Sequence, residues 1–136
     1  MAKEKLTTKK PIQKKEERVL VKTQAKYLRI SPRKLKLVVE AISHLSPEES
    51  LKRLRFLNKK GARFLIKAIK TAIADAQHNF QLKKGSLTFK NILVQEGPRL
   101  KRVDRSHGFR FNRGIIQKRM SHLIVELEGV RNGSKS

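Results

Sequence analysis

The sequence predicts an α+β domain in which one strand comes first, three helices follow, and two strands end the domain. Three observations indicate this order. Apolar residues recur at helical spacing between residues 31 and 80, whereas runs near both ends of the chain have the alternation or composition of strands. Ser-Pro and Gly-containing pairs separate these segments. The chain of 136 residues has room for one core, because domains usually contain about 100–150 residues.

The chain begins with a lysine-rich stretch, and we expect residues 1–22 to form a disordered basic extension. This stretch consists mainly of Lys, Glu, Thr and Gln, and its scattered apolar residues bury too little surface to offset chain entropy. Residues 23–30 then show a mixed alternation of polar and apolar side chains, which predicts a short strand.

Two Ser-Pro pairs open the first two predicted helices. At Ser31-Pro32 a hydroxyl N-cap precedes a proline, whose missing N–H costs nothing at the first helical position. Ser46-Pro47 repeats this arrangement, and Glu49 completes a capping box. The apolar residues that these helices should bury are Leu35, Val38, Val39 and Ile42 in the first and Leu51, Leu54 and Leu57 in the second.

The third and longest helix follows a break at residues 58–61, and two strands and a tail complete the chain. The stripe that the helix should bury is Leu65, Ile69, Ala72, Ile73, Ala76 and Phe80. After a turn at 83–86, residues 87–96 predict a strand that ends at Gly97-Pro98. Residues 122–128 alternate, with Leu123, Val125 and Leu127 facing inward. The polar tail at 129–136 should be flexible.

The charge of the chain predicts a polyanionic partner. Lys and Arg number 34 against 11 Asp and Glu, which gives a net charge of +23, and such a balance favours nucleic acid. A membrane surface would need an amphipathic face or a lipid anchor, and the sequence has neither. Cysteine is absent, which excludes disulfides and thiolate sites. No apolar run approaches the ~20 residues of a membrane span, and no signal peptide is evident, so we expect a cytoplasmic protein.

Basic residues are concentrated between the last two strands. If these strands pair antiparallel and continue outward, the segment at about 97–121 forms a two-stranded arm that projects roughly 40 Å. Arginine binds phosphate with two hydrogen bonds, and a helix start offers N–H groups to phosphate. The predicted RNA-binding residues are Arg33, Lys34, Arg99, Lys101, Arg102, Arg105, Arg110, Arg113, Lys118 and Arg119. The alternative is a flexible charged loop, which interleaved apolar residues such as Val103 and Ile115 disfavour.

Catalytic and metal sites are not indicated. Asp75 with His78, and Asp104 with His107, are the nearest approaches to a cluster, but a metal site needs three or four convergent ligands. We therefore expect no catalysis, no metal and no cofactor. A rival from another class is an architectural DNA-binding protein whose basic β-arm enters the minor groove.

Four ordered motifs resemble the bacterial L-twenty-two family of large-subunit ribosomal proteins. They are Ser31-Pro32-Arg33-Lys34, the run from Ala72 to Asn79, Glu96-Gly97-Pro98 followed by Lys101-Arg102, and the run from Lys118 to His122. The resemblance covers residues 23–128. It implies three helices packed on a three-stranded antiparallel sheet, a long protruding β-hairpin, and a place in the cytoplasmic ribosome.

The resemblance also implies partners and a position for the hairpin tip. The partners would be large-subunit, 23S-type ribosomal RNA, neighbouring large-subunit proteins and the nascent peptide, without self-association into a homo-oligomer. The protein would act in subunit assembly and line the peptide exit tunnel. The tip near the tunnel would comprise His107, Gly108, Phe109, Arg110, Phe111, Asn112, Arg113 and Gly114. This tip is slightly longer than is usual in the family and carries Phe109 and Phe111 where smaller residues are common.

Overall fold

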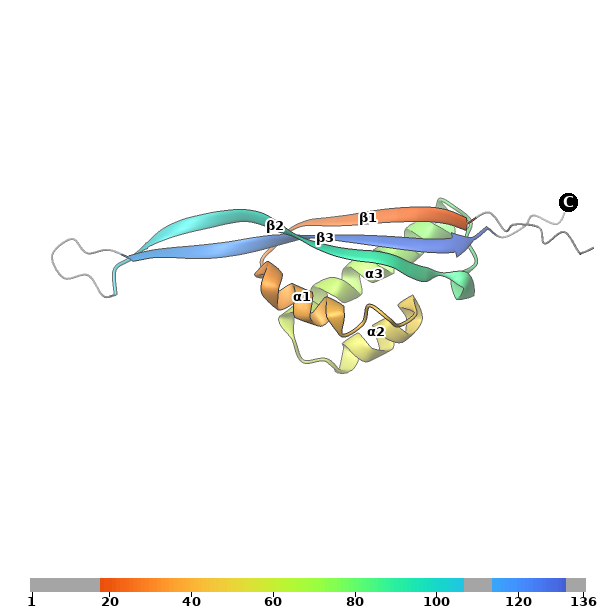
Figure 1. Cartoon of the computed structure of the whole chain (residues 1–136), viewed down its shortest axis with the longest axis horizontal. Helices are drawn as coiled ribbons and strands as arrows, with labels where there is room; N and C mark the ends of the chain where they lie inside the picture. The colour runs from red at the N-terminus through yellow and green to blue at the C-terminus, as the bar shows by residue number, and fades with distance from the viewer. Residues whose placement is uncertain (1–17, 107–113, 132–136) are drawn as a thin grey trace, which may run out of the picture.

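The computed structural model describes residues 18–106 and 114–131. Helical segments lie between a first strand and two long final strands, in the predicted order (Figure 1). The elements are β1 (Arg18–Leu28), α1 (Pro32–Glu40), α2 (Pro47–Phe56), α3 (Lys60–His78), the short 3-10 helix η1 (Lys84–Ser86), β2 (Thr88–Asp104) and β3 (Gly114–Val130).

The three strands form one antiparallel sheet with the order β1-β3-β2. The helices gather on one side of this sheet, and no other element of the described residues covers the opposite side (Figure 1). The predicted α+β class, with three helices on a three-stranded antiparallel sheet, is confirmed. Beyond the end of β1, strands β2 and β3 continue past the helices as a pair (Figure 1).

The core lies between the central strand and the helices. Leu123, Val125 and Leu127 of β3 are fully buried, as their alternation predicted. Leu35, Val38 and Val39 of α1 are buried, and so is Ile42, which was predicted in this helix but follows its end at Glu40. The α3 stripe from Leu65 to Ala76 is buried as well. The stripe ends there, because α3 ends at His78 and Phe80 is 39% exposed, which corrects its predicted place in the core. Within the described residues, no helix combines the length and apolarity needed to cross a membrane.

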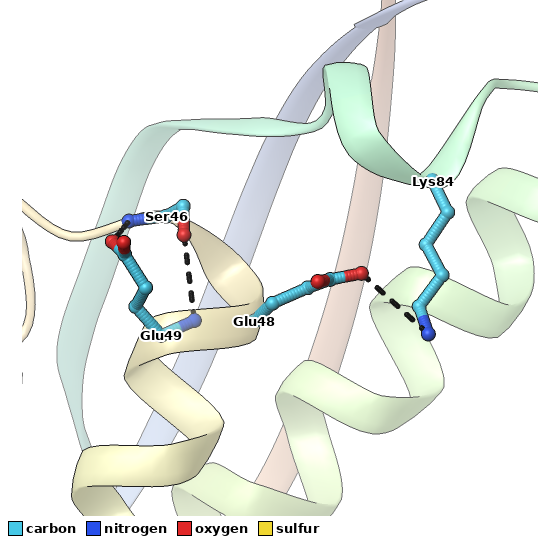
Figure 2. A network of polar contacts seen from close by, with 4 residues as sticks. All are labelled: Ser46, Glu48, Glu49 and Lys84. Carbon is cyan, nitrogen blue, oxygen red and sulfur yellow. Dashed lines mark hydrogen bonds and ion pairs between the residues drawn. The ribbon is translucent and has the colours of Figure 1, made fainter.

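The two Ser-Pro helix starts differ. Ser46 forms the predicted capping box: its Oγ accepts from the Glu49 N–H and its own N–H donates to Glu49 Oε2, both at 3.3 Å (Figure 2). Glu48 beside it pairs with Lys84 at 3.5 Å and ties α2 to η1 (Figure 2). The Ser31 side chain makes no capping hydrogen bond. The first turn of α1 relies instead on the proline and on the bond from Leu35 N to Ser31 O at 3.1 Å.

Both ends of the domain extend further than the sequence predicted. Residues 18–22, assigned to the disordered extension, belong to β1, where Val21 is buried and Lys22 lies opposite Glu126. Gly129, assigned to the flexible tail, belongs to β3, and an added Cβ there would lie 2.7 Å from Leu87 Cδ2. Pairing with distant strands orders both segments. Residues 1–17 and 132–136 lie outside the described residues, so their disorder stays a prediction.

Candidate RNA-binding interface

The predicted basic arm corresponds to the part of the β2–β3 ladder that lies beyond the helices. Its pairing runs from Arg99 opposite Arg119 to Asp104 opposite Gly114. We call residues 99–104 and 114–119 the arm. Six residues in each strand, at ~3.3 Å each, make it roughly 20 Å long. Because β1 and the helices do not accompany it (Figure 1), the elements that the structure describes leave both faces of this ribbon open to a partner.

Basic side chains occupy both faces of the arm. Residues directly opposite one another in a ladder share a face, and successive pairs alternate between faces. One face therefore carries the pairs Arg99/Arg119, Lys101/Gln117 and Val103/Ile115, and the other carries Leu100/Lys118, Arg102/Ile116 and Asp104/Gly114. Each face combines cations with apolar groups, so the arm can contact phosphate from either side.

The apolar residues of the arm are exposed rather than packed. Leu100, Val103 and Ile116 are exposed, and Ile115 is 67% exposed. A two-stranded ribbon is at best marginally stable in water, and contiguous exposed apolar surface marks an interaction site. The arm therefore has the composition of a surface that a partner covers.

Glu96, at the base of the arm, is bound by an arginine. The Arg99 guanidinium donates to Glu96 Oε2 at 2.6 Å. This hydrogen bond and the charge of Arg99, aided by the charge of Arg119, hold the pKa of Glu96 below its usual value. Arg99 is thus partly neutralised within the chain, whereas Lys101 and Arg102 further out are exposed.

Asp104 is the last residue of β2, and its side chain forms a turn with Ser106. Its Oδ1 accepts from the Ser106 N–H at 2.9 Å and from the Ser106 hydroxyl at 2.5 Å. These hydrogen bonds lower the pKa of the carboxyl group. The side chain therefore shapes the backbone as aspartate does in turns. His107, which was considered with Asp104 as a possible cluster, lies outside the described residues.

The remaining predicted residues divide into three groups. Arg105 follows β2 and is exposed. Arg33 and Lys34 are exposed in the first turn of α1. Lys34 also lines a cavity of about 540 Å³ between α1 and the α2–α3 connection, with apolar residues such as Leu37. Gly114 begins β3 and is exposed, and the other tip residues, His107, Gly108, Phe109, Arg110, Phe111, Asn112 and Arg113, lie outside the described residues.

A second feature at the base of the arm was missed in the sequence. The register between β1 and β3 shifts between Ala25 and Leu28, and Tyr27 has a φ of 57°. Its N–H donates to His122 Nδ1 at 2.9 Å, and the two rings meet edge to face with centroids 4.9 Å apart. The mixed alternation of residues 23–30 was the available signal, since a bulge interrupts the period of two.

Other polar clusters serve the fold. Asp75, weighed as a catalytic candidate, accepts from the Thr23 hydroxyl at 2.8 Å and so links α3 to β1. Across residues 18–106 and 114–131, no three His, Cys, Asp or Glu side chains come together in a group that could hold a metal ion.

Comparison with known proteins assigns the chain to a family. Residues 23–128 match the family model described as ribosomal protein L22p/L17e. A relative named large ribosomal subunit protein uL22 from Thermus thermophilus is 44% identical over 82% of this chain and 96% of its own length. The protein of that name from Petrotoga mobilis is 46% identical over 74% of this chain and 66% of its own length. The chain belongs to the ribosomal protein L22p/L17e family.

Proposed function

We propose that this chain, a non-catalytic structural component of the large ribosomal subunit, binds large-subunit ribosomal RNA of the 23S type. In this proposal its arm makes the main contacts, its binding supports subunit assembly, and its tip lines the peptide exit tunnel. The relatives that carry the large-subunit name come from bacteria, in which the ribosome is cytoplasmic. Family membership therefore supports the ribosomal role, and the arm supports the RNA contacts.

The observation that carries the RNA proposal is the presence of cations on both faces of the arm. A protein that docks on one side of a duplex needs only one basic face. Here Lys101 and Arg102 follow each other in β2 and so point to opposite faces. An arm with this pattern suits a narrow passage with phosphates on both sides, where shape and backbone charge govern recognition.

The exposed apolar residues support the same arrangement. In water, Val103 and Ile115 would remain exposed on the ribbon, whereas RNA sugar and base surfaces would cover them. The neighbouring proteins of the subunit are a second source of cover. The architectural DNA-binding rival places its wedge residues at the tip, where Phe109 and Phe111 are its candidates, and it gives no role to Val103 and Ile115 further down the arm.

The decisive experiment reverses charge on each face separately. Lys101→Glu and Arg102→Glu should each weaken binding to a large-subunit RNA transcript, and each should reduce the slope of log K against log salt by about one or more. The matched control is Lys52→Glu in α2, which makes the same charge change at an exposed position on the helical layer. Equal effects of all three variants would mean that RNA affinity depends only on the net charge of the protein, and would contradict an arm-specific site.

Assembly and the tunnel need experiments in cells. A tagged wild-type copy should remain on the large subunit after a high-salt wash in gradient sedimentation, because buried ion pairs are screened less than exposed ones. The double variant Lys101→Glu/Arg102→Glu should dissociate from the large subunit in the same wash. A photo-crosslinker at position 109 should capture a stalled nascent chain, whereas one at Phe80, outside the arm, should not. Crosslinks to RNA alone from position 109 would reject the tunnel contact.

A further inference from the structure

A concave site lies on the uncovered face of the sheet, at the base of the arm. Its volume is about 340 Å³, and the residues that line it are Gln24, Lys26, Tyr27, Gln95, His122, Leu123 and Ile124. This volume falls at the lower end of the range of small-molecule sites, roughly 300–1,000 Å³. Residues from all three strands therefore form one recess on a face that the helices leave open (Figure 1).

A β-bulge creates the recess. Ala25 pairs with Leu123 and Leu28 with Ser121, so two residues of β1, Lys26 and Tyr27, lie opposite the single residue His122 of β3. The extra residue leaves the ladder, and the Tyr27 N–H bonds the His122 ring instead of a β3 carbonyl. A bulge re-aims side chains in this way, and here it holds Tyr27 in the left-handed region at φ 57°.

The Tyr27 ring is held and accessible at the same time. Its perpendicular contact with the His122 ring and the hydrogen bond of its own N–H fix the residue, yet Tyr27 remains 62% exposed. A ring fixed before binding loses little conformational entropy when a ligand stacks on it. Aromatic side chains of this kind stack nucleobases in single-strand binders, and such stacking is worth about 1–3 kcal/mol per base.

Polar groups around the ring match the remaining parts of a nucleotide. Gln95 pairs with His122 and Gln24 with Ile124, so both amides face the same side as the recess. An amide carries donors and an acceptor, which suits the edge of a base. Lys26 lines the recess and can bind a phosphate, and the apolar Ile124 lies between these polar groups.

We propose that this recess binds one unpaired nucleobase of RNA. The base stacks on Tyr27, Gln24 and Gln95 hydrogen-bond its edge, and Lys26 binds the adjoining phosphate. His122 acts as a positioning residue because it holds the Tyr27 backbone. The inference rests on the proposed RNA binding and deepens it, since it adds a base contact beside the sheet to backbone contacts along the arm. Splayed, unpaired bases are the parts of folded RNA that proteins read individually.

The chain contains its own probe for this proposal. Tyr27 is the one tyrosine in the sequence and tryptophan is absent, so tyrosine emission reports on the recess. We would titrate the full-length protein with a single-stranded 12-nucleotide adenylate RNA and, separately, with a 12-base-pair RNA duplex at equal salt. Saturable quenching by the single strand, with binding of the duplex but no comparable quenching, is the expected result. Equal quenching by both would overturn the stacked base.

Variants separate stacking from charge. Tyr27→Asn removes the ring while retaining a residue that tolerates positive φ, and it should weaken single-strand binding by about 5- to 140-fold, the equivalent of one stacked base. Tyr27→Phe should bind like the wild type. The control Phe56→Ala removes an aromatic residue that is 90% exposed on α2, away from the recess, and should have no effect.

A further variant and the arm variants complete the design. Gln95→Ala leaves the ring and the bulge in place, so it should weaken single-strand binding while the thermal midpoint is unchanged. If Tyr27→Asn and Gln95→Ala bind as the wild type while Lys101→Glu weakens binding, the recess proposal fails and the arm proposal stands. If Lys101→Glu and Arg102→Glu weaken binding no more than Lys52→Glu, the proposed RNA-binding arm itself fails.

Discussion

Arg99 and Arg119 lie directly opposite each other in the β2–β3 ladder, and Glu96 binds Arg99 at 2.6 Å. Like charges at opposed positions of a sheet destabilise the pairing. In the isolated protein Glu96 offsets this repulsion, and phosphate would do so in an RNA complex. The arginines at the base of the arm therefore affect the stability of the fold and also belong to the RNA contact that we propose.

Glu96→Gln should loosen the base of the arm in the isolated protein. The neutral amide leaves two opposed arginines uncompensated, so amide hydrogen exchange at residues 99 and 119 should accelerate at low salt. Added salt should reduce the difference, because it screens exposed charges. The control Glu48→Gln removes the partner of Lys84 on α2 and should leave exchange in the arm unchanged. Equal protection in wild type and Glu96→Gln would reject this role for Glu96.

Protonation of Glu96 at acid pH should loosen the base of the arm as Glu96→Gln does. Arg99 lowers the pKa of Glu96 below its ordinary value of 4.5, so the folded arm binds this proton less readily than the unfolded chain does. The contribution of the pair is fully present above pH 4.5 and is lost as the pH falls through the lowered pKa. An NMR titration of the amides of residues 99 and 119, at the end of the arm remote from Asp104, should follow this transition in the wild type, and the transition should be absent from these amides in Glu96→Gln.

The serines at the starts of α1 and α2 should contribute different amounts to the free energy of unfolding, although each of them precedes a proline. Ser46→Ala removes the capping box of α2 and should lower the free energy of unfolding by about 1 kcal/mol. Ser31→Ala should cost clearly less, because the Ser31 side chain makes no capping hydrogen bond. Urea denaturation of both variants measures the difference. Equal losses would mean that the Ser31 hydroxyl caps α1 in solution.

Gly97 should be intolerant of a side chain. An added Cβ would lie 3.1 Å from the backbone carbon and 3.2 Å from the backbone oxygen of Met120, and this backbone is held between the ladder pairs of Arg119 and Ser121. Gly97→Ala should therefore destabilise the domain by about 1–3 kcal/mol. Gly85→Ala is the control, because a Cβ there meets nothing within 4 Å. Thermal unfolding of the two variants should differ, and equal midpoints would contradict the close approach.

The bond between Thr23 and Asp75 should stabilise the packing of α3 on β1. Thr23→Val keeps the shape but leaves the half-buried Asp75 carboxylate without this donor, and should cost about 1–3 kcal/mol. Thr71→Val is matched, because the Thr71 hydroxyl bonds the Lys67 carbonyl on the exposed side of the same helix and should matter little. A similar loss in both variants would mean that any threonine hydroxyl has this effect, and would reject a special role for the Thr23–Asp75 bond.

Local signals in the sequence were enough for the helices. The spacing of apolar residues and the Ser-Pro pairs predicted three helices because those signals act within a few residues of one another. Basic residues between two strands predicted the arm, and the ordered motifs predicted the family. The stripe was overextended only at Phe80, where the helix had already ended.

Tertiary pairing decided what local signals could not. Residues 18–22 are too short a run to form a stable strand by themselves, and they form one because β3 supplies hydrogen bonds from more than 100 positions away. The same register decided the two faces of the arm and the bulge that brings Tyr27 to His122. Strand pairing joins segments that are distant in the chain, so its register depends on the whole sheet. The sequence by itself determined which residues carry charge and form helices, and the sheet decided which of them meet.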